Sequence, residues 1–212
     1  MSKIESPKIP VHQKEANFQD IYEDEDPYLA NCLISNTTID FAEVEKLVLS
    51  KVTFKKVKLV NGFFNRIDMT DVVFEDCDLS NTNFSEGMIH RVQFKNCKIV
   101  GMNVSEATLG NVLFDQCIGN MTDFVEAKCK HVLFDQTSLQ QANFYGCYMK
   151  KVRFVSSDLD GVNFTEVSLN GIDLSTCRFD ILHVDRESLD GCLVSREQAI
   201  GFASLLGLQV RS

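Results

Sequence analysis

A large apolar residue recurs at almost every fifth position between residues 34 and 194, and the phase of this repeat never shifts. A period of five matches neither an amphipathic helix, whose period is about 3.6, nor a flat alternating strand, whose period is about two. A short repeat of constant length is instead typical of a solenoid, in which small units stack and each buries its apolar side against the next. The repeat centres include two undersized residues, Gly119 and Cys129. At Gly119 we expect either a local bulge that turns Ile118 or Met121 inward, or a bend in the solenoid.

A second restricted position lies two residues before each centre, and it holds small or β-branched residues such as Val52, Val72 and Ala107. Each unit of five therefore has two inward residues and three outward ones. The phenylalanines add a longer period of twenty residues, which is shown by Phe54, Phe74, Phe94, Phe114, Phe134 and Phe154. Four units per coil would place these rings on one wall, and alternating large and small side chains would fill the narrow interior.

Many units combine a small residue, a polar residue and a large apolar residue, as in Cys77-Asp78-Leu79, Thr82-Asn83-Phe84 and Ala142-Asn143-Phe144. This pattern resembles the pentapeptide-repeat family over about three quarters of the chain. The resemblance implies an all-β fold, a right-handed quadrilateral parallel β-helix with four repeats per coil and a short C-terminal α-helix. About eight coils would make a rod roughly 40 Å long at the ~4.8 Å spacing of parallel strands.

The repeat divides the chain into three segments. Residues 1–31 are expected to form an N-terminal cap with an exposed acidic loop between Glu23 and Pro27. Residues 32–194 are expected to form the β-helix, and residues 195–212 a C-terminal capping and dimerisation helix. That helix should begin at a capping box of Ser195 and Gln198, extend to residue 206, and end at Gly207. A cap protects the unpaired strand groups at the end of a solenoid from edge-to-edge aggregation.

Eight cysteines are present, and their positions argue against a disulfide or metal framework. Seven of them fill the small inward position, and these are Cys32, Cys77, Cys97, Cys117, Cys147, Cys177 and Cys192. We predict that the cysteines are buried small hydrophobic residues, with Cys77, Cys97 and Cys117 stacked on one wall. The sequence predicts no metal and no other cofactor.

The net charge of −9 argues against direct binding of nucleic acid, which requires a basic surface. At one outward position the coils should stack Glu86, Glu106, Glu126 and Glu166. Like charges ~4.8 Å apart repel each other, so this acidic column is either a plain solvated face or a surface offered to a basic partner.

Two further outward columns accompany the acidic one. Three residues before each glutamate lies a column that should support itself by side-chain hydrogen bonds, made of Asn83, Asn103, Asp123, Asn143 and Asn163. The next wall is mixed to basic and carries His90, Arg91, Lys128, Lys130, His131, Lys150, Lys151 and Arg153. The charge is therefore divided by face.

No sequence motif points to catalysis. The chain has no P-loop, GxGxxG or GxSxG motif, and its four histidines are scattered. A convex rod also offers no cleft that would perturb its carboxylates, so we expect no enzyme activity. The first residues lack the apolar core of a signal peptide, and no run approaches the ~18 apolar residues of a membrane span. We expect a soluble, cytoplasmic protein without membrane contact.

The ending Leu206-Gly207-Leu208 after a short helix resembles the tail of the quinolone-resistance (Qnr- and MfpA-like) subgroup of the family. The tail has more apolar residues than one end-coil needs, which suggests a two-fold interface. The resemblance implies a homodimer joined through Ile200, Phe202, Leu205, Leu206, Leu208 and Val210.

Members of this subgroup are rod-shaped dimers that imitate duplex DNA and occupy the DNA-binding saddle of DNA gyrase or topoisomerase IV. Some of them protect the enzyme from quinolones. The resemblance implies the same partner here, with Glu86, Glu106, Glu126 and Glu166 as the partner-binding surface. Since the phase is unbroken, the chain lacks the projecting loops of larger members and would act by shape and charge alone. The alternative is a structural or protein-interaction scaffold with an unidentified protein partner.

Overall fold

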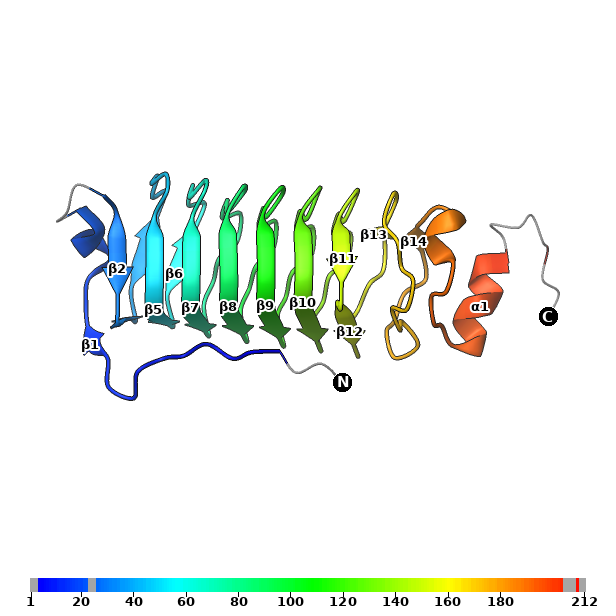
Figure 1. The fold of residues 1–212 in the computed structure, drawn as a ribbon, viewed down its shortest axis with the longest axis horizontal. Helices are drawn as coiled ribbons and strands as arrows, with labels where there is room; N and C mark the ends of the chain where they lie inside the picture. The colour runs from blue at the N-terminus through cyan, green and yellow to red at the C-terminus, as the bar shows by residue number, and fades with distance from the viewer. Residues whose placement is uncertain (1–3, 23–25, 204–208, 210–212) are drawn as a thin grey trace.

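The computed structural model describes residues 4–22, 26–203 and 209, and within them the chain winds into a straight rod of stacked coils (Figure 1). Parallel strands run across the rod, and each long strand pairs with the equivalents twenty residues before and after it. Val52, Val72, Val92 and Val112 are successive register partners along one column. This register confirms the predicted parallel β-helix with twenty residues per coil and about eight coils.

Strands of eight residues form the central part of the rod: β5 (Val48–Lys55), β7 (Asp68–Glu75), β8 (Met88–Lys95), β9 (Thr108–Asp115) and β10 (Lys128–Asp135). Each of these strands crosses two walls and the corner between them. Shorter strands lie toward the ends or on the other walls: β2 (Tyr28–Ala30), β3 (Cys32–Ser35), β4 (Thr38–Asp40), β6 (Lys58–Val60), β11 (Tyr148–Lys150), β12 (Arg153–Val155), β13 (Val162–Asn163) and β14 (Leu182–His183).

The chain turns a corner at every fifth residue, and that residue has a left-handed backbone conformation. From residue 31 to residue 171 every such position has a positive φ, whether or not it is a glycine. This conformation costs an ordinary residue roughly 1–2 kcal/mol, and asparagine and glycine suit it best. Asn81, Asn96 and Gly101 are corner residues of this kind. Equivalent corners of successive coils therefore form columns along the edges of the rod.

The interior is filled by stacked aromatic rings, as the twenty-residue period predicts. The rings of Phe54, Phe74, Phe94, Phe114, Phe134 and Phe154 follow one another with centroids 4.8–5.0 Å apart. A second stack meets the first edge-on, since the rings of Phe124 and Phe134 lie 5.7 Å apart at 83°. The columns of side chains argued from the sequence therefore exist in the folded chain.

The space left by Gly119 is filled by its neighbours and not by a bulge. A methyl group at Gly119 would lie 3.1 Å from Ile99 and 3.2 Å from Leu139, so these two side chains already occupy the interior. Ile118 and Met121 are 52% and 56% exposed, and the expectation that one of them turns inward is wrong. The amide of Gly119 still donates to the next coil at 2.7 Å, and the rod stays straight at this point (Figure 1).

Each end of the rod is covered by a short helical element. At the first end the 3₁₀ helix η1 (Phe18–Tyr22) places the buried ring of Phe18 edge-on to Phe64. At the other end, after the 3₁₀ helix η2 (Glu187–Leu189), the helix α1 (Arg196–Phe202) begins at the predicted capping box. α1 ends at Phe202, whereas the predicted helix ran to residue 206; residues 204–208, which include Gly207, lie outside the described residues.

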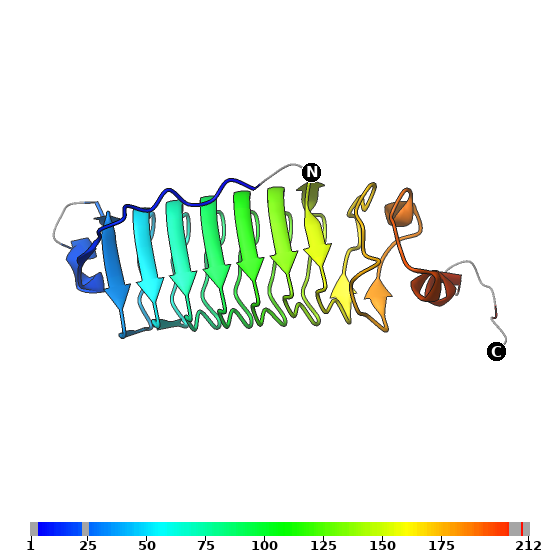
Figure 2. The same cartoon turned by 90° about the horizontal axis from the view of Figure 1, so that it is seen from below.

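Residues 4–13 do not belong to a cap and instead run back along the outside of the rod (Figure 2). We call this segment the N-terminal strap. It leads into β1 (Lys14–Glu15), which pairs in parallel with Cys32 and Leu33 of β3. Gln13 fixes the turn, because its side-chain amide donates to the carbonyls of Cys32 and Lys51 at 2.8 and 2.9 Å.

Candidate functional site

The four glutamates of the predicted binding surface lie at equivalent corners along one edge of the rod, and all are exposed. We call Glu86, Glu106, Glu126 and Glu166 the acidic edge. The amides of the first three donate to carbonyls of the next coil at 2.8–2.9 Å, so their side chains start from a fixed backbone. Gly146 takes the corner between Glu126 and Glu166 and interrupts the column.

Glu86 is partly neutralised by the coil before it. The Nε of Arg66 donates to Oε2 of Glu86 at 2.9 Å, and the amide of Asn65 donates to the other oxygen at 3.2 Å. The hydrogen bond from Arg66 lowers the pKa of Glu86, and the pKa of Arg66 is raised in return. The five ion pairs found in the described part of the chain do not involve Glu106 or Glu126. These two adjacent glutamates are therefore the strongest negative part of the edge.

The amide column beside the acidic edge mostly serves the backbone. The side-chain oxygens of Asn83, Asn103, Asp123, Asn143 and Asn163 each accept from the amide two residues on, at 2.8–3.2 Å. Only Asn163 also donates to its neighbour in the column, Asn143, at 3.0 Å. The expected ladder of side-chain hydrogen bonds is thus wrong for most of the column, because each oxygen is engaged in closing its own corner.

The basic wall is smaller than the sequence suggests. Arg91 makes two bonds to Asp71, at 2.6 and 2.9 Å, and its side chain is largely covered. The remaining basic residues cluster on β10, β11, β12 and the corner between the last two, and we call them the basic patch: Lys128, Lys130, His131, Lys150, Lys151 and Arg153. Lys130 and Lys150 are direct register partners. Across residues 4–22 and 26–203 no ion pair includes a member of this patch.

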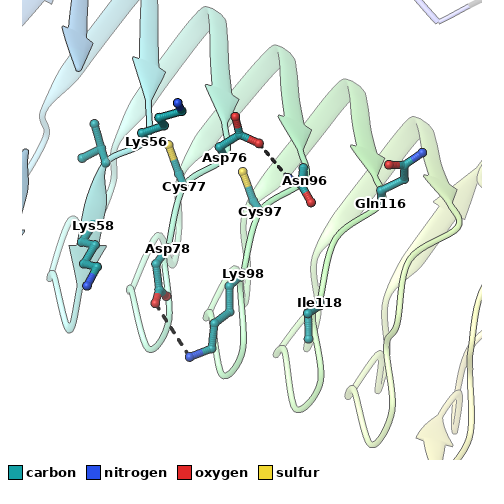
Figure 3. Close-up of a pocket in the computed structure, with 11 residues that line it drawn as sticks. Lys56, Lys58, Asp76, Cys77, Asp78, Asn96, Cys97, Lys98, Gln116 and Ile118 are labelled. Atoms are coloured by element: carbon teal, nitrogen blue, oxygen red, sulfur yellow. Dashed lines mark hydrogen bonds and ion pairs between the residues drawn. The ribbon is translucent and has the colours of Figure 1, made fainter. Parts of the chain in front are cut away.

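A shallow groove crosses another corner, and some of its polar groups bind one another (Figure 3). The amide of Asn96 donates to Asp76 at 2.7 Å, and Lys98 lies 3.7 Å from Asp78. The floor holds the thiols of Cys77 and Cys97, which donate to backbone carbonyls at 3.3–3.4 Å. Lys56 and Lys58 also line the groove, and neither is in an ion pair among the described residues, so only part of its charge is compensated.

The cysteines are buried thiols, as predicted, although Cys192 is only half-buried. The pKa of Cys97 is raised to about 12, chiefly by the contact with the Cys117 thiol, so it stays protonated and is a poor nucleophile. Cys129 and Cys147 form a thiol pair at 3.7 Å that the sequence did not predict. Among the described residues no group of three or more His, Cys, Asp and Glu side chains is placed to hold a metal ion.

The predicted dimer surface is only partly described. Ile200 is 51% exposed on α1, whereas the Phe202 ring packs on Phe179 of the last coil with centroids 5.8 Å apart. The side chain of Gln198 also joins α1 to that coil, donating to the carbonyls of Leu174 and Cys177 at 3.0 and 2.9 Å. The described residues do not include Leu205, Leu206, Leu208 and Val210.

A rod of parallel coils with a packed interior and its chemistry confined to outer columns is a β-solenoid, a class that presents long surfaces to other molecules. A model described as "Pentapeptide repeat region" matches residues 87–164, and one described as "Pentapeptide repeats (8 copies)" matches residues 48–85 and 153–180. The chain therefore belongs to the pentapeptide-repeat family. A search of curated protein sequences found no match.

Similar solved structures come from the same family. A trypsin-treated form of QnrB1, a plasmid-mediated fluoroquinolone resistance protein, is 18% identical with a TM-score of 0.45; the match covers 85% of this chain and 99% of that one. HetL, a pentapeptide repeat protein involved in heterocyst differentiation regulation in the cyanobacterium Nostoc sp. strain PCC 7120, is 11% identical with a TM-score of 0.40, over 79% and 89% of the two chains. In the part of the chain that is described, no helix is long and apolar enough to cross a membrane.

Proposed function

We propose that this chain is a non-enzymatic, cytoplasmic protein that imitates duplex DNA and binds a type II topoisomerase, DNA gyrase or topoisomerase IV. The observation that carries the proposal is the run of Glu86, Glu106 and Glu126 at equivalent corners of three successive coils on a straight rod. A fixed row of carboxylates suits a basic, concave partner, because complementary fields steer encounter and fix orientation.

The charge density of the rod sets how such binding would behave. Duplex DNA carries one negative charge per ~1.7 Å of axis, whereas the acidic edge offers at most one carboxylate per ~4.8 Å coil. Arg66 also neutralises Glu86. The contribution of charge should therefore be concentrated at Glu106 and Glu126, and binding should weaken as salt is raised. Protection against a quinolone would follow from occupation of the DNA-binding site.

Supercoiling by purified gyrase tests the proposal. We expect micromolar wild-type protein to inhibit the reaction, and Glu106→Lys/Glu126→Lys to lose at least tenfold in potency, because two carboxylates become repulsive cations. Asp115→Lys/Asp135→Lys is the matched control, since it changes the charge equally, in two successive coils, on another wall. Equal loss in both double variants would show that net charge alone matters. No inhibition by the wild-type protein at any salt concentration would contradict the topoisomerase assignment.

A second candidate function is a scaffold for another protein, and the basic patch favours it. Six basic residues on adjacent strands, without ion pairs among the described residues, are not what a DNA-binding groove should attract. A scaffold would use this patch to hold an acidic partner. Substituting Lys130→Glu/Lys150→Glu should then abolish partner capture from the source cells and leave gyrase inhibition unchanged, and the reverse result would exclude this candidate.

A homodimer joined through the C-terminal segment is part of the first proposal, since two rods end to end would double the length of the mimic. The support is the exposed apolar face of α1 at Ile200 and the apolar residues that follow it in the sequence.

A further inference from the structure

The N-terminal strap lies on a surface that is unusually apolar for the outside of this rod. The outward column that precedes the stacked phenylalanines contains Leu33, Val73, Leu113 and Leu133, where most outward columns are polar. Residues 4–7 line a crevice with Gln93, Leu113 and Leu133 of β8, β9 and β10. All three of these wall residues are half-buried.

Half-buried residues recur along the strap mainly at every third position. Ile4, Pro7 and Pro10 are half-buried, while Glu5, Ser6 and Lys8 are exposed. Ile9 is the one additional half-buried residue in this stretch. A period of three is that of the polyproline II conformation, which has three residues per turn. The two prolines favour this conformation, because the ring fixes φ near its polyproline II value.

The backbone of the strap is held at two points, also three residues apart. The amide of Glu5 donates to Oδ1 of Asn111 at 3.2 Å, and the amide of Lys8 donates to Oδ1 of Asp71 at 2.9 Å. Asp71 and Asn111 are equivalent corners two coils apart. Two coils span ~9.6 Å, and three polyproline II residues span ~9.3 Å. The repeat of the strap and the repeat of the rod are therefore commensurate.

The acceptor side chain at this corner is held in a fixed orientation by its neighbours. Asp71 is only 3% exposed and is oriented by two bonds from Arg91, which keeps its carboxylate charged and lowers its pKa. Arg91 in turn contacts Nε2 of His90 at 2.6 Å and feels the charge of Glu5. The surface thus offers fixed side-chain acceptors, Asp71 and Asn111, to the backbone N–H groups of the strap. It also offers the apolar side chains of Leu113 and Leu133 to the apolar residues and prolines of the strap. No part of this arrangement requires that the bound segment be covalently attached.

We propose that this corner, formed by Asp71, Arg91, Asn111, Leu113 and Leu133, is a binding site for extended, proline-containing segments of a partner protein, and that the N-terminal strap occupies it in cis. The bound segment repeats a triplet: a half-buried apolar residue or proline, a residue that donates its backbone N–H, and a third residue that is exposed at Ser6 and half-buried at Ile9. Proline suits the first position, where no N–H is used, and is excluded from the second. This site is separate from the acidic edge and does not depend on the topoisomerase proposal.

The test uses the full-length chain with its strap opened and a peptide of residues 4–13 as the probe. The opened chain carries Ile4→Asp, Pro7→Asp and Lys8→Pro, which remove two wall contacts and one donor without touching the coils. We expect the peptide to shift the amide resonances of Asn111, Leu113 and Leu133 in the opened chain. The wild-type chain should need at least a tenfold higher peptide concentration, because a tethered strap competes at an effective concentration of order mM.

Matched peptides distinguish the proposed binding mode, through a backbone N–H donor, from nonspecific apolar binding. The Lys8→Ala peptide keeps the backbone donor and should bind the opened chain within about threefold of the original peptide, since the Lys8 side chain is exposed. The Lys8→Pro peptide lacks the donor and should bind at least tenfold more weakly, because Asp71 is then left without its partner. Equal binding of these two peptides, or shifts confined to other walls, would overturn the proposal, as would the absence of any shift at millimolar peptide.

A second copy of the chain is the competing occupant, and the same samples distinguish it. If the wild-type chain formed a dimer that the opened chain lost, the corner would belong to strap exchange between copies and the proposal would fail. Loss of a C-terminal dimer would instead follow changes in α1 and leave peptide binding intact. An unfolded opened chain would be recognised by loss of the dispersed amide resonances of β7 to β10, in which case Pro7→Asp alone serves as the opened form.

Discussion

Phe94 shows how much a single interior residue contributes to the rod. Its ring lies between Phe74 and Phe114, with centroids 5.0 and 4.8 Å away, and it is 1% exposed. We expect Phe94→Ala to lower the free energy of unfolding by about 3–5 kcal/mol, because the coils above and below hold the cavity open. Lys95→Ala, on the solvent side of the same strand, should change it by less than about 0.5 kcal/mol. Denaturant titration measures both, and similar effects of the two substitutions would contradict the packed interior.

Asp71 gives a pH-dependent prediction at the same scale. The hydrogen bonds from Arg91 lower its pKa in the folded chain, although burial acts in the opposite direction. An ordinary aspartate titrates near pH ~3.9, so the unfolded chain takes up this proton at a higher pH than the folded chain does. The stabilisation by Asp71 is therefore complete above that pH and is lost as the pH falls through the lowered pKa.

Replacing Asp71 tests this sign. Asp71→Asn should lower the free energy of unfolding by about 3 kcal/mol at pH 7, because Arg91 loses a covered partner. The difference from the wild-type protein should shrink below pH ~4. Asp115→Asn, on an outward position without an ion pair, should have little effect at pH 7. A difference for Asp71→Asn that stayed constant down to pH 2 would exclude a charged Asp71 as its cause.

Ion pairs between coils are predictable from the repeat. Arg66 precedes Glu86 by one coil of twenty residues, as Asp71 precedes Arg91, so the register alone places each pair side by side. The columns of the repeat hold opposite charges as well as residues of one kind. The closing of each corner by an asparagine oxygen was also predictable, since Asn readily bonds an amide two residues on.

At the scale of elements, one side chain both caps α1 and joins it to the last coil. Gln198 accepts from the amide of Ser195 and donates to two carbonyls of the last coil. Gln198→Ala should lower the free energy of opening α1 by about 1.5 kcal/mol, which is roughly tenfold faster hydrogen exchange at the Ala199 amide. Arg196→Ala should not speed exchange, because a cation in the first turn opposes the helix dipole. Unchanged exchange in Gln198→Ala would mean that burial, and not the capping box, holds the helix.

The strap is the element that the sequence analysis missed, and the reason is physical. Residues 4–13 lack the period of five, so nothing in the repeat assigns them a place. Two weaker signals were present: apolar residues at outward positions, such as Leu113 and Leu133, and apolar residues or prolines spaced by three along the strap, at Ile4, Pro7 and Pro10. Neither signal is informative alone. Together they match an apolar outer column to a segment that can cover it.

For the whole molecule, the repeat predicted the architecture because the same inward residues recur in every coil. The aromatic stack, the thiol column at Cys77, Cys97 and Cys117, and the twenty-residue register all follow from position within a unit of five. The ends are less predictable, since each end coil lacks a neighbouring coil on one side and is covered by different residues. Phe18 covers Phe64 at one end, whereas Phe202 covers Phe179 at the other.

The assembly of two rods is a prediction that the described part of α1 sharpens. Phe202 packs on its own coil, so Phe202→Asp would disturb the cap as well as any interface. Ile200 is 51% exposed and is the better probe.

If the C-terminal segment forms a dimer, sedimentation of the wild-type chain should give twice the monomer mass of 23.9 kDa. Ile200→Asp should then shift it to the monomer, because a buried charge at a two-fold axis meets its own copy. Ile118→Asp, at an equally exposed apolar residue in the middle of the rod, should leave the mass unchanged. A wild-type monomer at all accessible concentrations would exclude the end-to-end dimer and, with it, the doubled length of the proposed DNA mimic.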